Sequence, residues 1–255
     1  MPEPETQPLG RPLVVATDLT KSFGGVHALR GVTMKIDQGE LVGLVGPNGS
    51  GKTTLVSLIS GAVPPTSGSI QLEGTEIVGM KPNRIAHLGI ARTHQIPRPF
   101  FSLTVRDNVA MAIMFGRDRR PLGEARAAAE EHLALVGLTD LADVYPNQVN
   151  LHERQLLEMA RAIATRPSVL LLDEALAGLN PVEVDNAVAV VQRIHRSGVA
   201  IVLVEHVLRV VNQLATRIIV LDQGKQLAEG EPSVVMSDRA VVAAYLGKQA
   251  DAPGN

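Results

Sequence analysis

The pattern of apolar and polar positions divides the chain into three parts. In the first part, short apolar runs bounded by glycine, proline and polar residues are typical of strands, and they predict strands at residues 13–16, 18–23, 32–36, 41–45, 69–72 and 89–93. We expect 18–23 and 32–36 to pair antiparallel. Residues 53–61 show a helical pattern that stops at a glycine.

In the second part, from about residue 99 to 165, apolar residues recur at spacings of three and four. This period predicts helices at 104–115, 124–136 and 153–165. In the third part, strands and helices alternate, which indicates a largely parallel sheet covered on both faces. The elements expected there are strands 169–172, 199–204 and 218–221 and a helix over 181–196.

These three parts predict an α/β fold in which one domain spans residues 13–247. Its core comprises 13–97 and 166–247 and includes an antiparallel β subdomain, and a helical subdomain over about 98–165 is inserted into it. Residues 1–12 and 248–255 are expected to be tails, the first of them disordered.

Composition excludes several classes of protein. The 255 residues hold 24 Lys and Arg against 26 Asp and Glu, and this balance argues against a general nucleic-acid binder. The absence of cysteine excludes disulfide scaffolds, thiol nucleophiles and cysteine-ligated metal sites. An aromatic content of 2% predicts an aliphatic core. No apolar run approaches the roughly 18 residues of a membrane span, and the N-terminus lacks a signal-peptide core, so a cytoplasmic location is expected.

Residues 46–53, Gly-Pro-Asn-Gly-Ser-Gly-Lys-Thr, match the phosphate-loop pattern G-x-x-x-x-G-K-[ST] between a predicted strand and a predicted helix. Glycines let backbone N–H groups surround phosphate oxygens, and the helix N-terminus adds a positive dipole end. Lys52 supplies charge to the β- and γ-phosphates, and Thr53 supplies a hydroxyl for Mg²⁺. The residues expected to bind a nucleoside triphosphate are Gly46, Asn48, Gly49, Ser50, Gly51, Lys52, Thr53 and Thr54.

Two carboxylates follow four aliphatic residues at 169–172. A buried parallel strand brings Asp173 and Glu174 to the sheet edge where ligands of α/β folds bind. Asp173 is therefore expected to hold Mg²⁺ through water, and Glu174 to orient or deprotonate an attacking water.

Taken in order, these motifs resemble the ATP-binding subunits of ABC transporters over about residues 13–247. The resemblance implies ATP and Mg²⁺ as ligands. It also implies that Phe23 stacks on adenine, that Gln95 contacts Mg²⁺ or water and couples to a membrane partner, and that His206 contacts the γ-phosphate. Glu174, His206 and Gln95 are thus the expected catalytic residues, and Thr53, Gln95 and Asp173 the expected metal-site residues.

Residues 23–29, 177–181, 204–206 and 244–247 look like those of branched-chain amino acid importer ATPases. An importer of related amides or urea is a variant of this interpretation. Lipopolysaccharide-export ATPases share parts of the pattern. A soluble ABC-type ATPase acting on nucleic acid or ribosomes, and a regulatory module with low turnover, are the alternatives from other classes.

One motif departs from the family. Residues 149–153, Val-Asn-Leu-His-Glu, stand where the signature L-S-G-G-Q is expected, and in the family that motif caps the ATP bound to the opposite subunit. We therefore expect a heterodimer with one weakened ATP site. The alternative is a tolerated variant in a fully active site, which a homodimer would also allow.

The resemblance also implies a permease partner on the inner face of the cell membrane, without insertion of this chain into the membrane and without nucleic acid. We expect the permease to dock in the cleft near residues 95–101, where the sequence offers a stiff, partly apolar surface made of Pro97, Pro99, Phe100 and Phe101. The alternative is that these four residues pack inside a hinge between the core and the helical subdomain.

Overall fold

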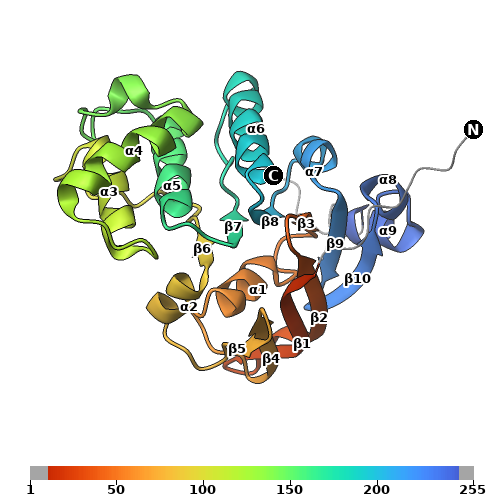
Figure 1. The fold of residues 1–255 in the computed structure, drawn as a ribbon. Coiled ribbons are helices and arrows are strands. Elements are labelled where there is room, and N and C mark those ends of the chain that lie inside the picture. The colour runs from red at the N-terminus through yellow and green to blue at the C-terminus, as the bar shows by residue number, and fades with distance from the viewer. Residues whose placement is uncertain (1–10, 247–255) are drawn as a thin grey trace, which may run out of the picture.

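The computed structural model describes residues 11–246, which form two sheets with helices around them (Figure 1). The larger sheet has the strand order β10-β9-β3-β8-β7-β6 and is parallel except for β10, which pairs antiparallel with β9. Its strands are β3 (Leu41–Val45), β6 (Ile90–Arg92), β7 (Val169–Asp173), β8 (Ala200–Val204), β9 (Arg217–Asp222) and β10 (Lys225–Gly230). The predicted parallel core sheet is therefore confirmed.

The smaller sheet is antiparallel, with the order β2-β1-β4-β5. Its long hairpin closes at a two-glycine turn between Phe23 and Val26, so the antiparallel pair is present, but its register differs from the prediction. Residues 32–36 lie opposite 14–19, with Leu19 opposite Val32, and residues 20–23 lie opposite 26–30, because both strands are longer than the apolar runs. The strands are β1 (Pro12–Phe23), β2 (Val26–Asp37), β4 (Ser67–Leu72) and β5 (Thr75–Glu76). The predicted first tail, 1–12, lies outside the described residues except for Arg11 and Pro12, and Pro12 already belongs to β1; the second, 248–255, lies wholly outside them.

Two apolar clusters cover the two faces of the larger sheet, because successive residues of a strand point to opposite sides. Along β3, Val42 and Leu44 face the antiparallel sheet and helix α1 (Lys52–Ile59), whereas Leu41 and Val45 face the other cluster. The second cluster is built largely from α6 (Pro181–Arg196) and the helical block. Its members are aliphatic, as the low aromatic content predicts.

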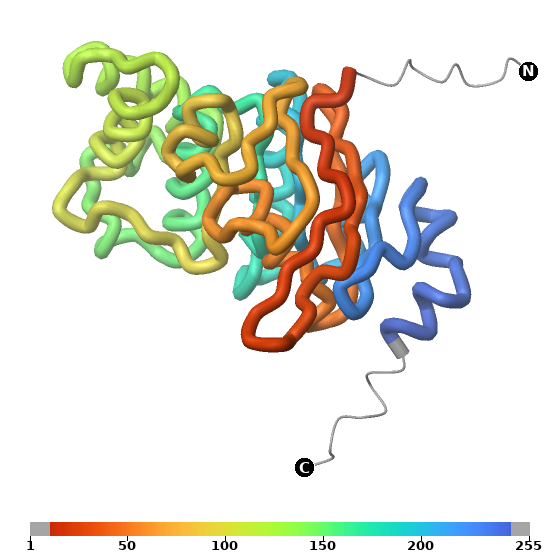
Figure 2. The backbone as a smooth tube through the Cα atoms, turned by 90° about the horizontal axis from the view of Figure 1, so that it is seen from below, coloured from red at the N-terminus to blue at the C-terminus, as the bar shows by residue number. Residues whose placement is uncertain are grey.

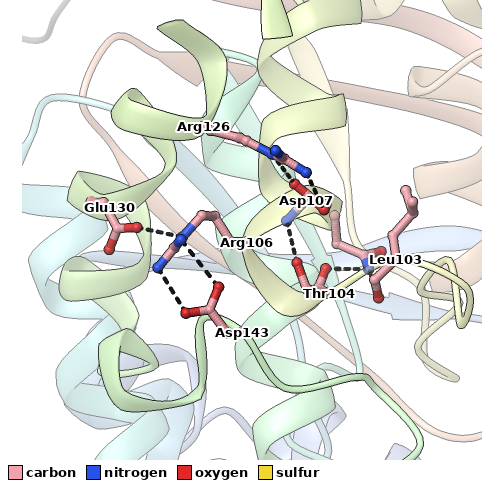
Figure 3. Close-up of polar contacts among 8 residues, drawn as sticks. Leu103, Thr104, Arg106, Asp107, Arg126, Glu130 and Asp143 are labelled. Atoms are coloured by element: carbon pink, nitrogen blue, oxygen red, sulfur yellow. Dashed lines mark hydrogen bonds and ion pairs between the residues drawn. The ribbon is translucent and has the colours of Figure 1, made fainter. Parts of the chain in front are cut away.

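The helical block comprises α3 (Val105–Phe115), α4 (Leu122–Val136) and α5 (Leu151–Ala164), which pack on one another beyond β6 and β7 (Figure 1). Ion pairs join α3 to α4 (Figure 3): Arg126 binds both carboxylate oxygens of Asp107 at 2.6 and 2.9 Å. The Arg126 guanidinium holds the pKa of Asp107 below its usual value. The helical block and the C-terminal helices occupy opposite ends of the molecule (Figure 2).

Short elements are the ones that the sequence pattern missed. They are β5, β10, the 3₁₀ helix Thr139–Leu141 and the helices α2 (Pro82–Leu88), α7 (Leu208–Leu214), α8 (Pro232–Val235) and α9 (Arg239–Leu246). The missed helices have three to eight residues and so hold too few turns for a clear period, and β10 is an edge strand without a buried residue. The equally short α1 was predicted because glycines mark both of its ends. Within the described part of the chain, no helix is both long enough and apolar enough to cross a membrane.

The buried side chain of Asn108 fixes the loop that leads from the core into the helical block. Its amide oxygen accepts the Phe100 N–H at 2.8 Å, and its amide nitrogen donates to the carbonyls of Phe100, Leu103 and Thr104 at 3.0, 3.2 and 2.9 Å. The loop's path therefore depends on one side chain.

We expect Asn108→Ala to lower the free energy of unfolding by about 2 kcal/mol, because it leaves the Phe100 N–H and several carbonyls without their buried partner. Urea denaturation measures this loss. Asn83→Ala, at an exposed position on α2, is the control and should change stability by less than about 0.5 kcal/mol. Equal losses in the two variants would contradict the role of Asn108.

Candidate active site

The loop after β3 has the geometry of an anion cradle. Gly46, Gly49 and Gly51 have φ values of 146°, 77° and 108°, in the region that favours glycine. A Cβ at Gly46 would lie 2.1 Å from the Leu221 carbonyl oxygen, so only glycine fits there. The loop leads directly into α1, and its backbone N–H groups can surround an anion at the helix N-terminus.

Lys52 lies at the start of α1 and is buried. Its ammonium donates to the carbonyls of Gly46 and Pro47 at 2.8 and 3.1 Å, which positions the charge inside the loop. The hydroxyl of Ser50 is also buried, and among the described residues it has no hydrogen-bond partner. A phosphate oxygen in the loop would satisfy such a hydroxyl. Asn48, Gly49 and Thr53 are exposed at the same loop, and Thr54 is half-buried.

Remote parts of the chain hold this loop in place. The Gly224 N–H, from the β9–β10 turn, donates to the Ser50 carbonyl at 2.9 Å. The Tyr245 hydroxyl, from α9, is hydrogen-bonded to the Gly46 main chain, and burial raises the pKa of this phenol. Sequence reasoning took Tyr245 only as part of a family resemblance, because its contact with the loop depends on where α9 packs.

Glu174 follows β7 and lies between two polar side chains. Gln95 Nε2 donates to Glu174 Oε2 at 2.5 Å, and His206 Nε2 lies 2.5 Å from Glu174 Oε1. The φ of Glu174 is 51°, an unfavourable conformation for a residue with a side chain, which costs about 1–2 kcal/mol. The structure therefore brings together the three residues expected to be catalytic, although they come from three different segments.

Asp173, one residue earlier, is nearly buried and forms an ion pair with Arg92. Arg92 Nη2 lies 2.7 Å from Asp173 Oδ2. The other oxygen, Oδ1, is buried and has no hydrogen-bond partner among the described residues. The sequence analysis did not identify Arg92, because an arginine on a short strand carries no local signal of its partner.

Glu205 directly follows β8, beside these two acids, and is also buried. Its Oε1 accepts the Leu176 N–H at 3.0 Å and so anchors the turn after Glu174. Burial raises the pKa of Glu205 to about 7; the hydrogen bonds from the Leu176 and His206 backbone oppose this shift, and the charges of Glu174 and Asp173 add to it. Near neutral pH this carboxyl is therefore partly protonated. Sequence reasoning gave it no role of its own.

Phe23 lies at the end of β1, and its side chain is half-exposed, so it is not a core residue. The Lys21 ammonium lies 4.9 Å from the centre of its ring. Ala28 and Leu29, at the start of β2, lie against the phosphate loop at Gly51. The hairpin that carries Phe23 thus packs beside the loop, with the half-exposed ring under the Lys21 ammonium.

Residues 149–153 begin α5 with a capping box. Asn150 Oδ1 accepts the Glu153 N–H at 2.9 Å, and Glu153 Oε2 accepts the Asn150 N–H at 2.8 Å. Asn150 is therefore the N-cap of α5, and the Glu153 carboxylate folds back on its own helix. His152 is turned inward, with Nε2 3.4 Å from the Asn186 amide on α6, and burial lowers its pKa. Leu151 is half-exposed.

A cavity of about 680 Å³ lies between the core and the helical block. Its walls include Arg92, His94, Arg98, Phe100 and Arg161. The Arg161 guanidinium lies 5.1 Å from the centre of the Phe100 ring and donates to Glu158 at 2.7 Å. Outside this list, Phe101 is exposed, whereas Pro99 is buried and Pro97 is half-buried, so the two prolines support the loop and expose little surface.

The arrangement can bind and cleave an activated phosphate. The glycine loop and Lys52 suit polyphosphate oxygens, the unpartnered Asp173 Oδ1 and the exposed Thr53 hydroxyl suit a hydrated Mg²⁺, and Glu174 suits a water molecule that needs a base. The residues present therefore fit a nucleoside triphosphate with Mg²⁺.

Glu205→Gln is expected to raise stability above neutral pH. Native Glu205 binds its proton more tightly than the unfolded carboxyl does, so the free energy of unfolding of the wild type falls as pH rises from 4.5 to about 7. This shift corresponds to about 3 kcal/mol. Glutamine keeps the oxygen for the Leu176 N–H without the charge. Thermal unfolding without nucleotide should show equal stability near pH 4.5 and a variant that is several degrees more stable at pH 8.

Glu124→Gln, at an exposed position on α4, serves as the control and should follow the wild type at every pH. If the difference between the wild type and Glu205→Gln did not change with pH, the protonation of Glu205 would be refuted.

Comparisons with known proteins agree with a site for a nucleoside triphosphate. A family model described as ABC transporter matches residues 29–177, and one described as branched-chain amino acid ATP-binding cassette transporter matches residues 225–251. The high-affinity branched-chain amino acid transport ATP-binding protein BraF of Pseudomonas aeruginosa is 35% identical, over 94% of this chain and 100% of that protein. LivG of Escherichia coli, which carries the same description, is 33% identical over 94% and 100%.

Solved structures agree in fold. The ADP conformation of MJ1267, an ATP-binding cassette of an ABC transporter, has a TM-score of 0.84 at 28% identity and covers 93% of this chain and 99% of that chain. The dimeric post-hydrolysis structure of the cassette MJ0796, bound to ADP and Pi, has a TM-score of 0.78 at 26% identity over 86% and 99%. The predicted P-loop fold of the ABC type is confirmed, and the chain belongs to the family of ABC transporter ATP-binding proteins.

Proposed function

We propose that this chain hydrolyses ATP to power a membrane transporter that imports branched-chain amino acids. The observation that carries the proposed hydrolysis is the placement of Glu174, between Gln95 and His206 and beside a complete phosphate loop. The likeness to BraF and LivG supports the solute class.

In the proposed mechanism, the glycine loop and Lys52 bind the phosphates of ATP, and Phe23 stacks on adenine. Glu174 accepts a proton from the attacking water, while His206 and Gln95 hold its carboxylate and contact the γ-phosphate side of the site. Both oxygens of Glu174 are hydrogen-bonded, one to Gln95 and one to His206. Each oxygen keeps a second lone pair, with which the carboxylate can accept the proton from water.

Thr53, Asp173 and Gln95 would hold Mg²⁺. The ion would neutralise charge on the β- and γ-phosphate oxygens. The buried, unpartnered Oδ1 of Asp173 supports this assignment, because such an oxygen is costly unless a ligand satisfies it.

A permease segment is proposed to dock in the cavity between the core and the helical block, which would hold the chain at the inner face of the membrane. Phe100 offers apolar area in the cavity wall, and Arg98 and Arg161 offer charge there. Ile96 and Phe101 are exposed in the same chain segment, next to the lining residues. Gln95 belongs to the same segment, and its side chain donates a hydrogen bond to Glu174. A permease docked at this segment would therefore act on the backbone that positions Glu174.

The start of α5 supports a heterodimer. The capping box uses the Glu153 N–H and the Asn150 side chain, both of which a regular signature would leave available to a phosphate across the dimer interface. A half-exposed Leu151 adds a side chain where a close approach is needed. This chain therefore offers few donors to ATP on a partner, while its own phosphate loop and both acids at the end of β7 are present and await a regular signature from the partner.

Glu174→Gln is expected to slow ATP hydrolysis by about 10²–10⁴-fold, because glutamine cannot accept the proton from water. The ATP-bound dimer should accumulate, as size-exclusion chromatography would show. Phosphate release is measured for the purified chain and with a reconstituted permease, and Glu124→Gln is the control. Near-normal turnover in Glu174→Gln would contradict the assignment of Glu174 as the base. If phosphate release by the wild type is low and does not change when the permease is added, the result would favour a low-turnover regulatory ATPase.

In the heterodimer, Glu174→Gln should reduce ATPase activity far more than the corresponding change in the partner subunit. The reason is that the ATP bound to the partner faces residues 149–153 of this chain, which replace the regular signature. Mixed dimers carrying one variant at a time measure the difference. Equal losses would refute the asymmetric sites and favour residues 149–153 as a tolerated variant.

A further inference from the structure

Arg92 lies between α1 and the end of β7, and the proposed mechanism gives it no role. It ends the edge strand β6, and its guanidinium is largely buried. Nη2 binds Asp173 Oδ2 at 2.7 Å, and Nη1 donates to the Ser57 hydroxyl at 3.0 Å and, more weakly, to the Ser60 hydroxyl at 3.5 Å. Both serines belong to α1 or its C-terminal cap, so Arg92 connects the helix of the phosphate loop to the strand that carries the acids.

The two oxygens of Asp173 have different environments. Oδ2 is held by Arg92, and Oδ1 is buried without a hydrogen-bond partner among the described residues. A carboxylate held at one oxygen by a fixed guanidinium cannot rotate freely about its terminal torsion. The contact with Arg92 therefore determines where Oδ1 points.

We propose that Arg92 is a positioning residue for Asp173, which orients Oδ1 toward the hydrated Mg²⁺ of the bound nucleotide. This inference rests on the proposed function, because it assumes that Asp173 binds that ion. Partners of this kind, which orient a metal ligand without touching the metal, typically change metal affinity by about 10–100-fold when they are removed.

The planar fork of arginine is needed for this geometry. One edge of the guanidinium contacts Asp173 while another nitrogen reaches α1. A lysine ammonium carries the same charge but is a point donor on a flexible stem, so it cannot hold both sides in one plane. Arg92→Lys thus separates orientation from charge.

Arg92 also lines the cavity between the core and the helical block. Gln95, three residues later, holds Glu174. Both acids at the end of β7 are therefore held by the segment that borders the proposed permease surface.

The test is the Mg²⁺ dependence of nucleotide binding. A fluorescent ATP analogue is titrated into the full chain in excess EDTA, and then at fixed nucleotide with increasing Mg²⁺. For Arg92→Lys we expect the half-saturating Mg²⁺ concentration to rise about tenfold or more, while affinity in EDTA stays within about twofold of the wild type. Arg92→Gln should show at least the same shift. Should it fail to fold, Arg92→Lys still decides the question, because it keeps the charge beside Asp173.

Arg217→Lys is the matched control. Arg217 forms a similar half-buried pair with Glu40 at 2.7 Å, at the opposite edge of the sheet, where β3 and β9 begin. It should lose stability without a change in the Mg²⁺ curve. An Arg92→Lys curve equal to that of the wild type would overturn the inference, whereas a wild type that shows no Mg²⁺-dependent nucleotide binding would refute the proposed function itself.

Discussion

The complete burial of the central parallel strands is the constraint on which the rest of the structure depends. Every residue of β3, β7 and β8 is buried, so these strands have no room for polar chemistry along their length. Polar groups can appear only where the strands end, and parallel strands end at one edge of the sheet. The phosphate loop, the acids after β7 and the Glu205–His206 pair after β8 therefore meet there.

This edge concentrates three carboxylates, which repel one another when all are ionised. The structure gives each a different environment: Asp173 pairs with Arg92, Glu174 is hydrogen-bonded by Gln95 and His206, and Glu205 is buried with a pKa of about 7. The differences separate their roles. Asp173 suits a metal ion and Glu174 suits the proton of an attacking water. Glu205 holds the turn that follows Glu174 by accepting the Leu176 N–H.

Local sequence predicted the elements that have a clear apolar pattern or turn residues at their ends. The β3 strand, α1 and α6 lie where periodicity and turn residues place them, and the phosphate loop carries its chemistry within eight consecutive residues. The grouping of Gln95, Glu174 and His206 followed only from family resemblance, because nothing local to each residue indicates the others. The short helices and the edge strand β10 escaped prediction, since their patterns are too brief or too polar.

The sequence by itself thus determined the order of the main strands and helices, the aliphatic core and the presence of a phosphate loop, because each depends on residues within a few positions of one another. Only the tertiary structure decided that Arg92 holds Asp173, 81 positions away, and that Glu205 anchors Leu176, 29 positions away. It also decided the protonation of Glu205 and the inward turn of His152. These properties arise from strand register and burial, which long-range packing sets and a local pattern does not record.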